Sequence, residues 1–557
     1  MHRFTLFKTS LLLLSSVFFV QSLYASDRRG EIHRFFESYN VKNYNKCGFH
    51  IIAHYFGLPN AEMSIKQVLQ IRPTNDTSIV SPSGKFRIHF DTSGVNQPFL
   101  YDSVGQPIPN STFAFVDTVA KISDHVYHVE VDSLGYPPPP PDSGAGGGNE
   151  YDIYVQDLPI GEYGYTDWED SHPIINRVNP TYAAWMVIRN EFESTYTKGI
   201  PAVEVTIAHE FHHGIQIGNY GLWQNDLWFY ELTSTWMEQV VYPGVKDYYQ
   251  YLPNFFNNVD QPFNLYNPNS YAGYERCVFG IFVQNEHEYG AQVMKSIWQN
   301  MAHEPAVPAI EDAFKGIGVS PSYVFQLFAQ WNYFTGYRTQ FAGQYAFSTY
   351  PQAVNYPLVK VSGIGSLSGS GVDFSESALR LTEHFYQVSE GTDTVGMAVV
   401  NNNFTAAVNY DTTSFPFSVG ISSGGPNCVR ELSGGYCLFF NTADYGNWGL
   451  VPFILGKVLA AKNDVVFPQP FNPSLQNLRI PYPFSDIINA SLSIYDISGN
   501  LINKFTGDSK IVYYLRGKYF LWDGKDRNGK TVGSGVYIYI LTDGSKSVAG
   551  KIAVVRN

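Results

Sequence analysis

One short stretch limits what this chain can fold into more than any other. Residues 207–214 read Ile-Ala-His-Glu-Phe-His-His-Gly and contain the pattern H-E-x-x-H, formed by His209, Glu210 and His213. Residues four apart on an α-helix lie on the same face, so the two imidazoles can bind one Zn²⁺ ion, and the glutamate between them can face a coordinated water. The apolar run at residues 202–208 predicts that this helix is buried.

A second predicted helix, at residues 228–238, carries the candidate for a third ligand. This segment is mostly apolar, with Glu231 among aromatic residues, and seventeen residues separate Glu231 from His213. A catalytic zinc site needs three protein ligands and one open position, and two histidines with one glutamate are a known set. Glu238 falls on nearly the same face as Glu231, where it either orients a ligand histidine or remains a solvated or helix-capping residue.

His212 is an alternative to His213 as the second ligand, because it lies three residues from His209 and therefore near the same face. The position of Glu210 within the motif favours His213. A buried cluster of histidines and glutamates that holds no metal is the alternative interpretation of the whole group.

The two helices together resemble the gluzincin metallopeptidases. In this sequence H-E-x-x-H is followed by W-x-x-E-x-x-x-T-W at residues 228–236. The similarity extends from about residue 71 to about residue 336 and is closest to a family of secreted bacterial metalloproteases in that clan. It implies a zincin-like fold with Zn²⁺ as cofactor. It assigns the metal ligands to His209, His213 and Glu231, and the general base to Glu210.

The same resemblance points to Tyr271, by its position, as the tyrosine that some gluzincins use to stabilise the oxyanion. The family pattern usually has a lysine and a glycine after this tyrosine, whereas this chain has Ala272 and Gly273. A structural role for Tyr271 is equally consistent with the sequence. In zincin folds an edge strand near the metal binds extended substrate, and residues 161–166 are the candidate for that strand.

Composition limits the possible partners. Hydrophobic residues make up 44% of the 557 residues and charged residues 15%, which excludes a wholly disordered chain. The net charge of −13 argues against binding to nucleic acid, which requires a basic face. The length predicts several domains, because a single core rarely grows this large.

Residues 1–25 are typical of a secretory signal peptide. His2, Arg3 and Lys8 form a cationic start, a short apolar core follows, and Leu-Tyr-Ala at residues 23–25 is an acceptable cleavage site. The apolar run is short for a transmembrane helix, although a membrane anchor is the alternative. We therefore expect a secreted protein that has no transmembrane segment after signal removal.

Residues 26–80 are predicted to be a helical propeptide or N-terminal extension, and they contain Cys47. A thiolate there could cap the zinc until the segment is removed, although a half-cystine or a buried thiol is the simpler expectation. The four cysteines allow three connectivities. The preferred one joins Cys428 to Cys437 across a hairpin and leaves Cys47 and Cys277 to pair with each other.

The remaining domains are predicted from strand and turn patterns. From Gly84 onward we expect strands, and we place the metallopeptidase domain at residues 81–345. A β-sandwich follows at 346–462, and a small domain with Asp-Gly and Asn-Gly turns occupies 463–557. This last domain resembles the sorting domains of type IX secretion and the FlgD-type immunoglobulin-like module. The predicted fold class is an α+β zincin-like catalytic domain followed by all-β C-terminal domains, a sandwich and an immunoglobulin-like module.

These features predict a secreted zinc-dependent peptidase that acts on protein or peptide substrates. The resemblance of the last domain implies the secretion machinery as a partner and a secreted or outer-membrane-surface location. An endopeptidase is favoured, because the chain has no G-A-M-E-N-like segment to hold a substrate amino terminus. An aminopeptidase is one alternative, which cleavage of blocked peptides would exclude. A catalytically silent surface-binding or adhesion protein on a protease scaffold is the other, and the intact Glu210 argues against it.

Overall fold

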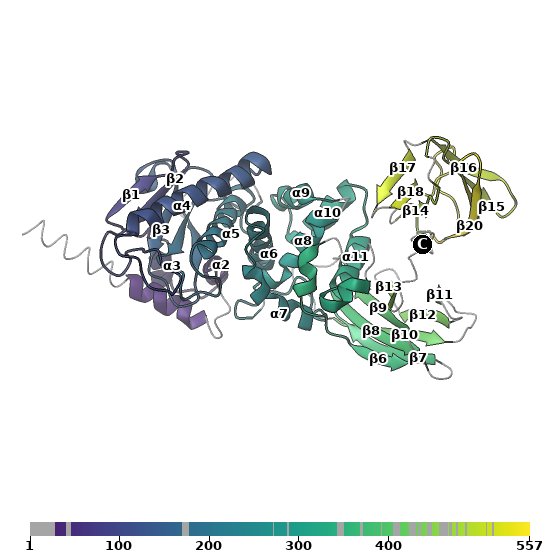
Figure 1. Ribbon diagram of the computed structural model, residues 1–557, viewed down its shortest axis with the longest axis horizontal. Coiled ribbons are helices and arrows are strands. Elements are labelled where there is room, and N and C mark those ends of the chain that lie inside the picture. Colours follow the sequence, from purple (N-terminus) through teal and green to yellow (C-terminus); the bar gives the residue numbers. More distant parts are fainter. Residues whose placement is uncertain are drawn as a thin grey trace, which may run out of the picture. The chain divides into compact units, whose positions relative to one another are not determined.

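The computed structural model describes residues 28–39, 46–169, 178–270, 272–286, 289–341 and, with short gaps, 350–556 (Figure 1). The chain divides into two compact units. The first consists of the described residues up to Pro253, together with those of Asn264–Ile281 and Lys295–Ala306. The second consists of Asn254–Phe263, the described residues of Phe282–Met294, and those from Val307 onward. It is an α+β protein with a strand-rich C-terminal region.

A five-stranded mixed sheet organises the first unit. Its order is β1-β2-β3-β5-β4, in which β2, β3 and β5 run parallel, while β1 and β4 are antiparallel strands at the two edges. Every second side chain of β2 is fully buried, whereas all side chains of β5 are buried, as expected for an inner strand that is covered on both faces. The strands are β1 (Thr77–Val80), β2 (Phe86–Phe90), β3 (Tyr151–Gln156), β4 (Gly164–Trp168) and β5 (Ala184–Arg189).

Helices pack on this sheet and on one another. A helix covers residues 28–39, and α5 contacts both β4 and β5 while also packing against α6. The helices of the first unit include α2 (Phe49–Gly57), α3 (Met63–Leu69), α4 (Thr112–Tyr127), the π-helical turn η1 (His128–Ser133), α5 (Ile200–Asn219), α6 (Leu227–Val241) and the short turn η5 (Tyr274–Arg276). The residues of α7 (Leu252–Asn257), α8 (Cys277–Asn285) and α9 (Ala291–Met301) are divided between the two units.

Helix α5 is the central element of this unit. Pro201 lies in its first turn, where the N–H that proline lacks would have no helical partner. Every residue from 205 to 218 is buried. A helix that is apolar or buried on all sides must lie inside the protein, and here the sheet, α4 and α6 surround it. The predicted buried helix around the H-E-x-x-H motif is therefore confirmed.

The described residues of the second unit include most of α10 (Ala306–Gly316), all of α11 (Pro321–Tyr333), the short turns η6 (Gly336–Phe341) and η8 (Pro351–Asn355), and two regions of paired sheets. Four-stranded sheets of order β11-β12-β10-β7 and β13-β9-β8-β6 share one apolar core. Their strands are β6 (Gly363–Ser366), β7 (Gly371–Ala378), β8 (Thr382–Glu390), β9 (Asp393–Asn401), β10 (Phe415–Ser422), β11 (Arg430–Leu432), β12 (Tyr436–Thr442) and β13 (Trp448–Leu455).

The C-terminal region has its own core between a three-stranded sheet, β14-β18-β17, and a four-stranded sheet, β16-β15-β19-β20. Two packed sheets of this size agree with the small all-β domain predicted for residues 463–557. The strands are β14 (Leu478–Pro481), β15 (Ser491–Asp496), β16 (Leu501–Thr506), β17 (Ile511–Tyr514), β18 (Gly517–Trp522), β19 (Gly535–Thr542) and β20 (Ser547–Val554).

The cysteine prediction is wrong in one respect. Cys47 and Cys277 are both buried and free, so they do not form the expected disulfide. Cys428 lies outside the described residues, and so does the predicted signal peptide. The backbones of β11 and β12 do pair as antiparallel neighbours, as expected for the hairpin.

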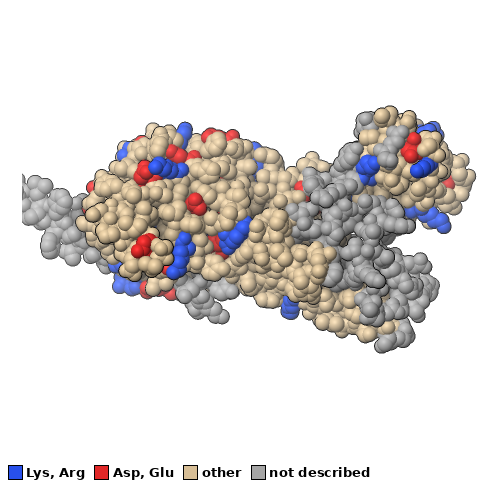
Figure 2. Space-filling model, viewed as in Figure 1, with Lys and Arg blue, Asp and Glu red and all other residues tan. Residues whose placement is uncertain are grey.

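Two surface properties bear on partners. On the face shown in Figure 2, basic and acidic side chains of the described residues are interspersed rather than separated by sign. Among the described residues, no helix combines the length and apolar character needed to cross a bilayer.

One buried carboxylate in the second unit yields a pH prediction. Burial raises the pKa of Glu383 to about 8, and Asn332 Nδ2 donates to both of its oxygens at 3.1 Å. The folded state therefore retains a proton that the unfolded state releases near pH 4.5. The stability of this unit should fall as the pH rises from about 4.5 to about 8, by about 1.4 kcal/mol per unit of pKa shift as an upper limit.

Replacing Glu383 by Gln should flatten that decline, because a neutral amide can still accept a hydrogen bond from Asn332. Denaturant unfolding of the second unit between pH 4 and pH 9 measures this. Asp312→Asn, which changes an exposed carboxylate in the same unit, should leave the decline in place. An identical pH dependence in the parent protein and in Glu383→Gln would contradict the prediction.

Candidate metal centre

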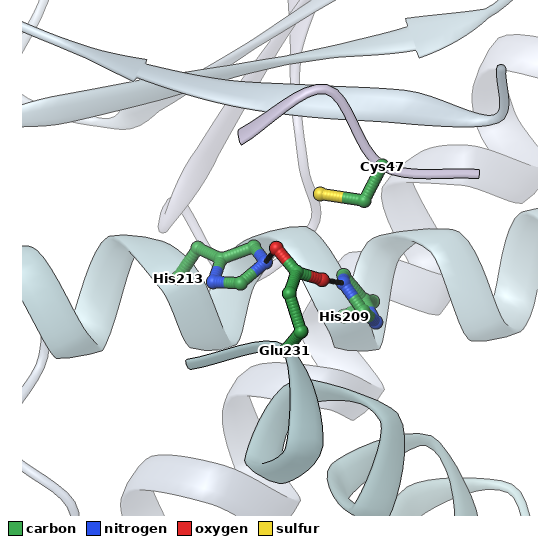
Figure 3. A group of neighbouring side chains, drawn as sticks. All are labelled: Cys47, His209, His213 and Glu231. Atoms are coloured by element: carbon green, nitrogen blue, oxygen red, sulfur yellow. Dashed lines mark hydrogen bonds and ion pairs between the residues drawn. The ribbon is translucent and has the colours of Figure 1, made fainter. Parts of the chain in front are cut away.

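Four side chains converge between α5, α6 and the N-terminal segment (Figure 3). His209 and His213 project from α5, Glu231 from α6, and Cys47 from the chain just before α2. One ligand atom from each side chain lies within 4.8 Å of the others, and all four residues are buried. The structure thus brings together the three residues predicted as zinc ligands and adds the sulfur of Cys47.

The protonation of His209 is determined by its neighbours. Its Nδ1 lies 2.7 Å from Glu238 Oε1, which also accepts from Lys46, so with Glu238 ionised Nδ1 is the nitrogen assigned the donated proton. Burial lowers the pKa of His209 to about 3, which keeps the ring neutral. Nε2 therefore has a lone pair, and it points at Glu231 Oε2 from 3.0 Å. Of the two roles considered for Glu238, the structure shows the one that orients His209.

His213 is held in the same way by its own helix. Its Nδ1 lies 2.7 Å from Gln216 Oε1, and the amide nitrogen of Gln216 donates to the hydroxyls of Thr233 and Ser234, which fixes the direction of the amide. Burial lowers the pKa of His213 to about 3. Its Nε2 consequently presents a second lone pair, and this nitrogen lies 3.3 Å from Glu231 Oε1.

This arrangement fits a divalent cation. Two imidazole lone pairs face the two oxygens of one carboxylate, and His213 Nε2 and Glu231 Oε1 are buried without a hydrogen-bond partner. Acceptors in this arrangement repel unless a proton or a cation lies between them. A zinc ion with tetrahedral ligands at about 2.0–2.3 Å would set the ligand atoms about 3.3–3.8 Å apart. The observed nitrogen–oxygen distances of 3.0 and 3.3 Å are close to that spacing.

Glu210 lies on the same helix, beside the edge strand. Thr166 Oγ1, on β4, donates to Glu210 Oε2 at 2.8 Å, and the Cys47 thiol hydrogen-bonds the same carboxyl group. Burial raises the pKa of Glu210 to about 8. A Cβ at Gly164 would lie 2.7 Å from the carbonyl oxygen of Val187 and 3.3 Å from Glu210 Cγ, so only glycine lets β4 approach α5 this closely.

Two other predicted residues are placed differently. His212 points away from the cluster, with its Nδ1 2.8 Å from Glu130 Oε2, so it is His213 that joins the group. Tyr271 lies outside the described residues. Tyr274, three residues later, is the tyrosine that the structure places beside the site, with its ring 5.9 Å from that of His209.

The segment that carries Cys47 is anchored by a buried lysine. Lys46 Nζ lies 2.6 Å from Glu238 Oε1 and 2.8 Å from Asp247 Oδ2, and these two acids raise the pKa of the lysine against the effect of burial. Glu238 therefore contacts both the lysine and His209. Burial raises the pKa of Glu238 to about 8.

Sequence reasoning did not identify several of these neighbours. Gln216 lies three residues after His213, so helical spacing alone contained the signal for it. Thr166 lies within the edge strand that was predicted to bind substrate, and that strand is indeed at the edge of the sheet. Lys46 and Tyr274 carry no local pattern, because each reaches the site only through the tertiary fold.

Comparison with protein-family models and with curated proteins finds no match. Among solved structures, the chain is similar to PorZ of Porphyromonas gingivalis, an essential bacterial surface component of its type-IX secretion system, at 17% identity and a TM-score of 0.14 over 32% of this chain. It is also similar to dimeric latent PorU of the same organism, at 18% identity and a TM-score of 0.14 over 33% of this chain. The matches span only 23% and 20% of those two proteins.

Proposed function

We propose that this protein is a secreted zinc-dependent peptidase. The observation that supports it best is the convergence of two imidazole lone pairs on the carboxylate of Glu231, with Glu210 beside them on α5. His209, His213 and Glu231 would hold the ion. When bound, zinc supplies a Lewis acid that polarises a peptide carbonyl and makes a water molecule more acidic.

The residues of the chain would then perform the proton transfers. Glu210, held by Thr166, would accept the proton of the attacking water and deliver it to the leaving amine. Burial raises the pKa of Glu210 to about 8 in the metal-free chain, and the charge of a bound cation beside it would lower that pKa. Glu238 and Gln216 would keep each ligand histidine in the tautomer that presents Nε2.

The edge strand gives a peptide substrate a place to bind. β4 pairs with β5 on one side. On its other side residues 46–48 pair with Gly164, and an extended peptide that replaced them would lie at the level of Gly164 and Thr166, next to Glu210. Export is supported by the signal-like residues 1–25 and by the resemblance of residues 463–557 to secretion sorting domains. We propose the secretion machinery as the partner of that last domain.

Zinc content and peptide hydrolysis test this function together. The protein should hold one zinc per chain, and His213→Ala should not retain it after dialysis, because it removes one of the two imidazole ligands and leaves a cavity where the ring was. His212→Ala is the matched control, since it changes the adjacent buried histidine that binds Glu130 and should keep the metal. Hydrolysis of casein is measured in the parent and in Cys47→Ser, because the sulfur of Cys47 lies beside the three proposed ligands, where it could exclude water from the metal.

Zinc in His212→Ala but not in His213→Ala, with casein cleavage that a chelator abolishes, is the expected result. A folded parent protein that binds no zinc would overturn the proposal and favour a surface-binding protein. Cleavage of peptides with blocked termini would identify an endopeptidase rather than an aminopeptidase.

A further inference from the structure

The N-terminal segment at residues 46–57 covers the metal cluster. Phe49, the first residue of α2, stacks on the ring of His213 with ring centroids 4.1 Å apart and an interplanar angle of 22°. Phe49, Ile51 and Ile52 are fully buried, so this turn of helix is part of the core above the site. Lys46 anchors the start of the segment through Glu238 and Asp247.

The same segment pairs with the edge of β4 that faces away from β5. Cys47 forms a parallel bridge with Gly164, Gly48 N donates to Gly164 O at 2.9 Å, and Tyr163 N donates to Lys46 O at 2.7 Å. Tyr274 encloses it from the other side, with its hydroxyl 3.2 Å from the carbonyl oxygen of Cys47. These are the backbone positions at which an extended peptide substrate would add to the sheet.

The sulfur of Cys47 occupies the space between the ligands and the base. It belongs to the cluster with His209, His213 and Glu231, and its thiol also hydrogen-bonds Glu210. The backbone N–H of Phe49 lies 3.3 Å from the sulfur and can stabilise a negative charge on it. A water activated by Glu210 would need this same space.

From these contacts we propose that Cys47 Sγ is the fourth protein ligand of the zinc ion, so that residues 46–57 close the site in this form of the chain. Zinc bound by four protein ligands has no position for water, whereas a catalytic site keeps one open. On binding, a sulfur–zinc bond forms and the thiol proton passes to solvent. Hydrolysis then requires this bond to break and the segment to leave β4. This inference rests on the proposed zinc site, but it can be tested without measuring activity.

Cobalt(II) substitution in the full-length chain gives the first test. A thiolate bound to Co²⁺ produces an intense charge-transfer absorption in the near ultraviolet, which histidine and carboxylate ligands do not. We expect this band in the parent and in Cys277→Ser, and its loss in Cys47→Ser. Cys277 is the matched control, because it is also buried and free but lies outside the ligand cluster. A parent without the band, or Cys47→Ser that retains it, would overturn the inference.

Thiol alkylation provides a second test that needs no substitution. The protein is treated with iodoacetamide with zinc present and after chelation, and the modified peptides are quantified by mass spectrometry. Zinc should slow alkylation of Cys47 by at least about tenfold, because a ligand bound only to the closed form suppresses opening by mass action. The alkylation rate of Cys277, which lies outside the cluster, should change much less than that of Cys47 when zinc is removed. Equal rates for Cys47 in both conditions would contradict the inference.

Peptide hydrolysis separates this inference from the proposed function. If the charge-transfer band is present but no peptide is cleaved by the parent, by Cys47→Ser, or by Cys47→Ser after limited proteolysis of residues 46–57, the thiolate ligand is supported and the peptidase is contradicted. If the parent cleaves casein as fast as Cys47→Ser and shows no band, the peptidase is supported and the fourth ligand is contradicted.

Discussion

Replacing Glu210 by Gln is expected to lower peptide hydrolysis by about 10²–10⁴-fold while zinc remains bound, which is the range attributed to a positioned general base. Glutamine has nearly the same shape and can still accept the hydrogen bond from Thr166, but it cannot take a proton from water. The substitution should therefore change the chemistry without changing the fold or the ligands.

The measurement is the rate of cleavage of a blocked peptide, with zinc determined on the same samples. Both chains should carry Cys47→Ser, so that the fourth position is open to water. Glu204→Gln is a suitable control, because Glu204 lies earlier on the same helix and has no contact with the ligand cluster. Hydrolysis that persists unchanged in Glu210→Gln with zinc bound would exclude Glu210 as the base.

Replacing Lys46 by Met is expected to destabilise the first unit by about 3–5 kcal/mol, the range found when one partner of a buried ion pair is removed. Lys46 is 3% exposed, and both of its acidic partners are fully buried. Without the lysine, Asp247 retains the hydroxyl of Tyr163 as a hydrogen-bond donor but loses its cationic partner. The cost is large because the remaining charge stays in a medium of low polarity.

Hydrogen exchange of peptides from the first unit, resolved by mass spectrometry, measures this loss separately from the second unit. Lys121→Met is the control, since Lys121 forms an exposed pair with Asp117 one turn away on α4. Such surface pairs contribute about 0–1 kcal/mol. Equal protection in Lys46→Met and Lys121→Met would show that the buried pair does not stabilise the unit.

The parts of the fold that the sequence predicted were those with a local period. The spacing of His209 and His213 required one helical face, and the alternation of residues 86–90 indicated a strand that the structure contains. Helix α4 was missed, although Phe115, Val119 and Val126 recur at helical spacing within a region read as strands. The error came from extending the pattern of β2 beyond its end.

In the candidate site, too, the residues with a local sequence pattern were predicted, whereas the pairing that brings in the N-terminal segment was not. Glu231 was placed by its spacing from His213 and by resemblance, and Glu238 by its position on the same face, and both lie where α6 meets α5. Lys46 and Cys47 reach the cluster from the N-terminal segment, far from α5 in the chain. A zinc-capping role for Cys47 was one of the alternatives that the sequence allowed, and the structure places its sulfur in the cluster. No pattern in residues 46–48 predicts the pairing with β4 that brings it there.

The stacking of Phe49 on His213 and the placement of Cys47 beside the ligands make segment docking and metal binding thermodynamically reciprocal. If docking of residues 46–57 strengthens zinc binding by some factor, zinc must strengthen docking by that same factor. A peptide that competes with residues 46–57 for the edge of β4 would then lower the affinity for zinc. A low zinc concentration would likewise weaken the docking of that segment. If the proposed zinc site is correct, the supply of metal would in this way set how much of the chain remains in the closed form.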